Sequence, residues 1–106
     1  MNSPWLTLGV IVAPLGIRGE VKVLSQSDFP ERFLHPGPRW LQSPQGGEPQ
    51  AVTLQKGRPV PGKNLYILQL TEVTNRSQAE GLVNYSLVIP QAERGDRRYG
   101  RAPLGP

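Results

Sequence analysis

Arg18 and Lys22 are the side chains whose types and spacing most clearly offer chemistry in this sequence. Arg18 lies in a turn rich in Pro and Gly, and Lys22 lies four residues later in an alternating segment. A guanidinium group can pair bidentately with a phosphate or a carboxylate, whereas an ammonium group binds either one as a point charge. A tight turn does not require arginine, while the solvent face of a strand commonly carries lysine. The pair therefore predicts a binding surface, with Arg18 as its stronger candidate.

Gly16 and Gly19 enclose Ile17 and Arg18 in a GxxG tetrad. In KH domains such a tetrad joins two helices and clamps a nucleic-acid backbone, but here it joins two predicted strands. The other interpretation is that the glycines permit the positive φ angles of a tight turn. Both interpretations stay open, so Gly19 is kept with Arg18 and Lys22 among the candidate binding residues.

Further cationic side chains lie at both ends of residues 57–63, which are rich in Pro and are predicted to form an unpaired loop. Arg58 and Lys63 could contact RNA from this loop, although a solvated loop is the simpler explanation for them. Trp40 and Tyr66 could stack on bases, as in OB folds, or pack in the core. The core is the simpler explanation for both aromatic residues.

Catalytic constellations are missing from the sequence. There is no Cys, and His35 is the single His, with no carboxylate cluster at ligand spacing. No nucleophile–base pair, paired carboxylates or phosphate-binding glycine loop of the Walker type is present. We therefore expect a chain that is not an enzyme, without catalytic residues, metal or cofactor.

Composition favours a single all-β domain. The 106 residues suffice for one modest core, and 12 Pro and 12 Gly are typical of about six short strands joined by turns. No apolar run approaches the ~20 residues that span a bilayer, and the first residues lack the features of a secretory signal. A cytoplasmic location without membrane contact is expected. The net charge of +4 only weakly favours a nucleic-acid partner.

Alternating apolar residues place the strands. In residues 6–13 we expect Leu6, Leu8, Val10 and Val12 to face the core, with Gly9 marking a bulge or a close crossing of backbones. The other predicted strands are residues 19–26, 39–42, 50–56, 64–71 and 85–89. Of these, residues 64–71 are apolar on both faces and are expected to form a central strand.

Two short helical segments interrupt the strands. Residues 27–33 predict one helical turn, capped by Ser27 or Asp28, with Phe29 and Phe33 closing one end of the domain. Residues 74–83 predict a second helix, capped by Thr74 or Asn75 and ended by Asn84 in the left-handed conformation. The domain is expected to span residues 1–90, and residues 91–106 are expected to be a disordered linker.

Three ordered blocks resemble one family. Residues 9–23, residues 27–33 and residues 71–82, with Val88-Ile89-Pro90 after them, closely resemble the N-terminal domain of the RimM family. This family comprises 16S rRNA-processing factors of bacteria and plastids. The resemblance covers roughly residues 8–90 in the correct order, which makes it specific.

The resemblance implies a six-stranded antiparallel β-barrel, similar to a barrel of translation factors, with one short helix before the last strand. In the family a linker leads to a C-terminal PRC-barrel domain, and the resemblance implies that this chain stops within that linker, so that this domain is expected to be absent from it. The family assists maturation of the head of the small (30S) ribosomal subunit and binds small-subunit ribosomal protein number 19 near 16S rRNA. The resemblance thus implies a monomeric assembly factor of the cytoplasm, or of the plastid stroma in a plant.

One departure and one alternative accompany the resemblance. The family usually has His before the turn glycine, whereas this sequence has Leu15, so a polar role of that side chain is not expected here. A generic RNA-binding small β-barrel is the alternative function, based on the basic loops. An enzyme of translation-factor ancestry has no supporting set of residues.

Overall fold

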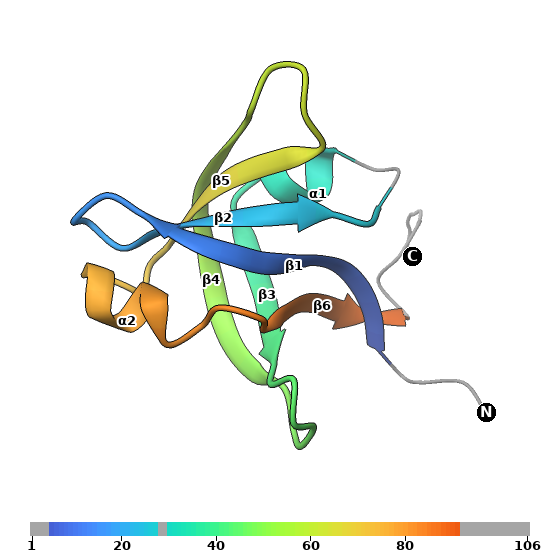
Figure 1. Ribbon diagram of the computed structural model, residues 1–106. Coiled ribbons are helices and arrows are strands. Elements are labelled where there is room, and N and C mark those ends of the chain that lie inside the picture. Colours follow the sequence, from blue (N-terminus) through green and yellow to red (C-terminus); the bar gives the residue numbers. More distant parts are fainter. Residues whose placement is uncertain (1–4, 28–29, 92–106) are drawn as a thin grey trace.

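Six segments of the chain pair into a closed antiparallel barrel in the computed structural model, which describes residues 5–27 and 30–91 (Figure 1). The strands are β1 (Trp5–Leu15), β2 (Glu20–Ser25), β3 (Gly37–Gln42), β4 (Gln50–Pro59), β5 (Leu65–Leu70) and β6 (Ser86–Pro90). Around the ring they follow the order β1-β2-β5-β4-β3-β6, and β6 pairs with β1 to close it. The expected six-stranded barrel is confirmed, with β5 between β2 and β4.

Alternation places the apolar core inside the ring. Val21 and Val23 of β2 are fully buried, as the period-two pattern predicts. Leu24 lies on the outward face of β2, between the buried Val23 and Ser25, and is 41% exposed. The buried side chains that form the main core cluster are Leu8, Ile11, Val21, Val23, Phe33, Leu41, Val52, Leu54, Leu68, Leu70, Val73, Ala79, Leu87 and Ile89.

In strand β1, the side chains do not alternate between the core and the solvent as regularly as the sequence predicted. Its register shifts between Thr7 and Gly9 against β6, and between Ile11 and Ala13 against β2. A bulge sets two residues opposite one and changes which face the following side chains occupy. Ile11 is therefore buried, and Val12, which was expected to line the core, is 40% exposed.

The bulged strand also needs a glycine where it crosses β2. A Cβ atom on Gly9 would lie 2.6 Å from the carbonyl oxygen of Leu24, too close for any other residue. The prediction that Gly9 marks a bulge or a close crossing of backbones is confirmed, because both occur there.

The first helix, α1 (Glu31–Leu34), closes one end of the barrel (Figure 1). Phe33 is fully buried, as predicted, and its ring stacks on Tyr66 with centroids 4.5 Å apart. The helix begins at Pro30, which provides no side-chain cap, so the predicted cap by Ser27 is wrong. The predicted roles of Asp28 and Phe29 lie outside the described residues.

The second helix, α2 (Arg76–Glu80), packs beside the β1–β2 turn (Figure 1). Asn75 is its N-cap, as predicted, and Asn84 has the expected positive φ of 79°. The helix ends at the Gly81 C-cap, before the predicted end at residue 83, because glycine is a poor helix former. The predicted linker lies, apart from Gln91, outside the described residues.

Candidate binding surface at the β1–β2 turn

The turn between β1 and β2 requires its two glycines. Gly16 has a φ of 71° and Gly19 a φ of 91°, both in the left-handed region that side chains disfavour. Leu15 pairs with Glu20 at the base of the turn and closes the hairpin. The interpretation of these glycines as turn residues is therefore confirmed, and the tetrad joins strands rather than helices.

Gly19 also lies in close contact with the start of α2. It is buried, and a Cβ atom there would lie 2.8 Å from both the backbone nitrogen and the carbonyl oxygen of Asn75. The Asn75 side chain accepts a hydrogen bond from the backbone N–H of Gln78 at 2.9 Å. In return, Gln78 Oε1 accepts from the backbone N–H of Thr74 at 2.7 Å. The turn thus rests on a helix start that is held by its own caps, and Gly19 positions its neighbours.

Ile17 and Arg18 form the exposed tip of the turn, which extends beyond the barrel at the left of Figure 1. Ile17 is 84% exposed, the highest value among the exposed large apolar side chains. Within residues 5–27 and 30–91, no hydrogen bond or ion pair engages the Arg18 side chain. The tip therefore presents an apolar side chain and an unpaired guanidinium group to a partner.

Lys22 extends this surface along β2. It lies across from Ala13 on one side and Ile67 on the other, and Val21 and Val23 beside it point inward. The bulge in β1 exposes Val12 close to this position. Lys22 is only half-buried, so its ammonium group can reach solvent next to the exposed Val12.

Arg58 lies on a strand rather than in the predicted loop, because β4 continues through Pro59. Val60 donates its N–H to Leu65 of β5 at 2.9 Å. The backbone N–H groups of successive strand residues point to opposite sides, so the nitrogen of Pro59 points away from β5. On that side of β4, pairing with β3 has already ended at Leu54, so no partner strand is present. The missing N–H of Pro59 therefore costs no ladder hydrogen bond, and the prediction of an unpaired loop at 57–59 is wrong.

This strand position ties Arg58 to the base of the turn. Its guanidinium group lies 3.2 Å from the carboxylate of Glu20. The Arg58 side chain is 57% exposed, so the ion pair contributes little to stability but partly neutralises the cation. Lys63 is exposed in the separate β4–β5 loop at the top of Figure 1. The fold therefore groups Arg18, Gly19, Lys22 and Arg58, and leaves Lys63 apart.

The two aromatic residues considered for base stacking pack instead. Tyr66 stacks on Phe33, and the ring of Trp40 lies 5.5 Å from that of Trp5 at a tilt of 52°. Both are partly buried against the main core cluster. Core packing, the simpler explanation for both residues, is therefore confirmed.

The part of the chain that the structure describes contains no group of three or more His, Cys, Asp or Glu able to hold a metal ion. In the same residues no helix has the length and apolar character needed to cross a membrane.

Sequence reasoning missed Ile17 as a member of this surface. In the sequence, Ile17 resembles an ordinary turn residue, and its exposure follows only from the way the turn projects beyond the barrel. One feature of the sequence indicates this role: a tight GxxG turn does not require an aliphatic residue, yet Ile17 lies inside it.

Comparison with known proteins places this fold in one family. Residues 6–94 match the model of the RimM N-terminal domain. A ribosome maturation factor RimM of Synechocystis is 58% identical over 90 residues, covering 85% of this chain and 49% of that protein. Its counterpart in Synechococcus elongatus is 53% identical over 100 residues, covering 94% and 55%. The chain thus spans about half the length of these curated relatives.

A solved structure agrees with the sequence comparison. The crystal structure of a protein described as the 16S ribosomal RNA processing protein RimM of Pseudomonas aeruginosa superposes with a TM-score of 0.72 at 30% identity. The superposition covers 84% of this chain and 52% of that one. The family model, the relatives and the shared barrel lead to one conclusion: this chain belongs to the RimM family.

Proposed function

We propose that this chain is the barrel domain of a ribosome maturation factor, which assists 16S rRNA processing and assembly of the head of the small subunit by binding. The observation that carries the proposal is the match of residues 6–94 to the RimM N-terminal domain. Relatives about half identical to this chain are named ribosome maturation factors. The proposed action is binding without catalysis.

The β1–β2 turn is the proposed contact surface. Arg18 is unpaired among the described residues, Lys22 lies on the same hairpin, and the turn packs against α2 at Gly19. A turn that packs on a helix loses less conformational freedom on binding than an unsupported loop, which favours affinity. Phosphates of 16S rRNA and carboxylates of a small-subunit protein, number 19 in particular, are the partners proposed for the two cations. Arg58 and Lys63 are secondary members.

Reversal of the two turn charges tests this surface. In the double variant Arg18→Glu and Lys22→Glu, the affinity for isolated small subunits is expected to fall by at least about tenfold, because attraction becomes repulsion. Affinity is measured by fluorescence anisotropy of the labelled chain. Thermal unfolding should change little, since neither side chain belongs to the core.

The single variants Arg18→Glu and Lys56→Glu form a matched pair, because each replaces one cation by an anion and Lys56 is exposed away from the turn. Lys56→Glu should bind like the unmodified chain, and Arg18→Glu should bind more weakly. Equal affinity of these two variants would refute the turn as the contact surface.

The generic RNA-binding barrel makes a different prediction. Such a barrel should bind arbitrary RNA with a logarithmic salt dependence set by the number of phosphates it neutralises. Trp40 and Tyr66, the two candidates for base stacking, pack against the main core cluster instead, which does not favour this alternative.

A further inference from the structure

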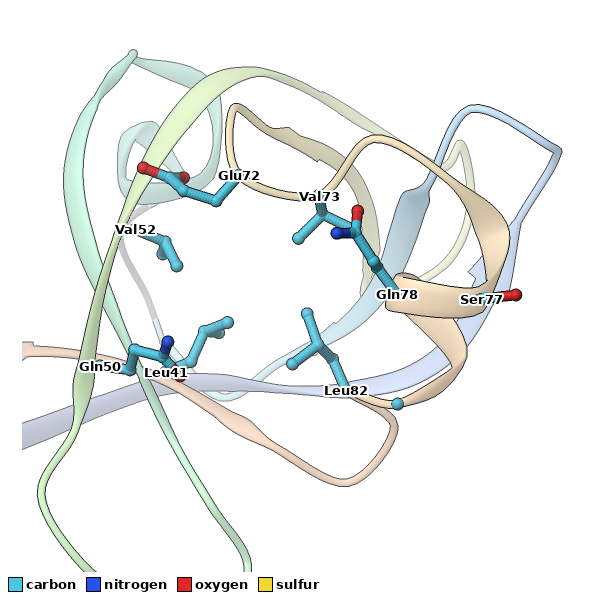
Figure 2. A pocket seen from close by; sticks show the side chains of 9 residues that line it. Leu41, Gln50, Val52, Glu72, Val73, Ser77, Gln78 and Leu82 are labelled. Carbon is cyan, nitrogen blue, oxygen red and sulfur yellow. The ribbon is translucent and has the colours of Figure 1, made fainter.

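A concave surface lies on the other side of α2 from the turn. Between α2 and the strands β3 and β4, the barrel wall opens into a groove of about 300 Å³ (Figure 2). This α2 groove is lined by Leu41, Gln50, Val52, Glu72, Val73, Ser77, Gln78, Gly81 and Leu82. The side chains of Leu41, Val52, Val73 and Leu82 surround its centre (Figure 2). Its volume is at the small end of the ligand-pocket range and suits one large side chain.

Glu72 supplies a fixed carboxylate at the rim of the α2 groove. Its Oε1 accepts a hydrogen bond from the backbone N–H of Thr53 at 2.8 Å. The backbone of β4 is itself held there, because Thr53 accepts from the N–H of Thr71 at 2.9 Å. Within the described residues, Oε2 of Glu72 makes no hydrogen bond and no ion pair. The carboxylate is thus held in position, with one oxygen available.

Gln78 supplies a donor on the opposite side. Its Oε1 accepts from both the backbone N–H and the hydroxyl of Thr74, at 2.7 and 3.2 Å. These bonds orient the amide, and its Nε2 has no hydrogen-bond partner in the described part of the chain. The groove therefore combines an apolar centre, one anionic acceptor and one neutral donor. No Lys or Arg lines it.

We infer that the α2 groove binds a basic protein segment, which inserts one aliphatic or aromatic side chain and pairs an adjacent Arg or Lys with Glu72. Charge complementarity selects this occupant, because the fixed carboxylate attracts a cation and repels the phosphates of a nucleic acid. Gln78 Nε2 can donate to a carbonyl group of the bound backbone. The inference stands on the groove itself and does not require the ribosomal role.

The test uses a defined probe, the acetylated and amidated peptide Gly-Ser-Phe-Arg-Ser-Gly, titrated into the ¹⁵N-labelled chain. Saturable shifts are expected at the backbone amides of Val73, Gln78 and Leu82, with a dissociation constant of about 1 mM or below. Peptides with Ala for Phe, or Glu for Arg, should bind at least about tenfold more weakly. An absence of saturable shifts at these amides would overturn the inference.

The variant Glu72→Gln removes the negative charge at the rim of the groove and keeps the hydrogen bond from Thr53. The amide oxygen can still accept from Thr53, so the fold is retained, while the peptide affinity should fall about fivefold. Glu48→Gln, an equal charge change in the exposed β3–β4 loop, should leave the affinity unchanged. Equal weakening of peptide binding by both variants would contradict the proposal that the peptide binds in the α2 groove.

A single-stranded RNA provides a second test. If it shifts the same amides more strongly than the peptide does, the inference of a basic protein partner is wrong. Binding to ribosomal subunits is a separate readout, so the two proposals can fail independently.

Discussion

Replacement of Gly57 by alanine is expected to lower the free energy of unfolding by about 3 kcal/mol or more, at the upper end of overpacking effects. A Cβ atom at Gly57 would overlap the carbonyl oxygen of Phe33 and lie 2.7 Å from Cδ2 of Leu68. The overlapped atom belongs to the backbone of α1, so no rotation of a side chain can relieve it. The helix that closes the barrel would have to move. Thermal unfolding should shift downward by roughly 15 °C.

Gly81→Ala is the matched control for this prediction. A Cβ atom at Gly81 meets only Gln78 O at 3.5 Å and Ser77 O at 3.8 Å, which are ordinary contacts. Its φ of −70° suits alanine, so this variant should be neutral or more stable by up to about 1 kcal/mol. If the two variants unfold at the same temperature, α1 does not pack on β4 as described.

Replacement of Arg39 by methionine is expected to cost about 3 kcal/mol. Arg39 is 9% exposed, and its guanidinium group donates to backbone carbonyls of α1, of its C-cap residue and of β3. The distances are 3.1 Å to Arg32, 2.9 Å to His35 and 2.7 Å to Pro38. Methionine fills similar volume but leaves these carbonyls without the donors, and unsatisfied buried acceptors are costly. Chemical denaturation measures the loss directly.

Two comparison variants test whether the lost hydrogen bonds cause the lower stability of Arg39→Met. Arg58→Met removes an exposed arginine whose ion pair with Glu20 is largely solvated, so it should cost less than about 1 kcal/mol. Arg39→Lys keeps the charge but loses the planar fork, so its stability should fall between those of the unmodified chain and Arg39→Met. A loss at Arg39→Met no larger than at Arg58→Met would contradict the anchoring role of Arg39.

Local patterns were sufficient for much of the fold. Val21 and Val23 alternate with polar residues and face inward, and the polar group Thr74-Asn75 predicted a cap that Asn75 provides. Such signals arise from neighbours in the chain and survive folding. The prediction of a closed ring came from the resemblance, since no local pattern specifies that β6 pairs with β1.

Features that depend on distant contacts could not be predicted. The bulges in β1 reversed the side of Val12, because register is decided by the partner strands. Pro59 joined β4 because the neighbouring ladder with β3 ends earlier. Arg39 resembled an ordinary strand residue in the sequence, and its burial follows only from the position of α1.

The binding surface was predicted in part. Arg18 and Lys22 were selected by residue type, and the structure shows Arg18 exposed and Lys22 half-buried on one hairpin. That Gly19 rests on Asn75, and that Arg58 pairs with Glu20, required the packed structure. The α2 groove could not be foreseen either, since its walls come from β3, β4 and α2, which are distant in the chain.

Sedimentation with ribosomal particles tests the central claim most directly. The chain is mixed with isolated small subunits or with intact 70S ribosomes at equal concentration, and the particles are pelleted at near-physiological salt. A maturation factor for the small subunit should pellet with free small subunits and remain largely in the supernatant with 70S ribosomes. Equal pelleting with both particles, or with neither, would contradict the proposed function.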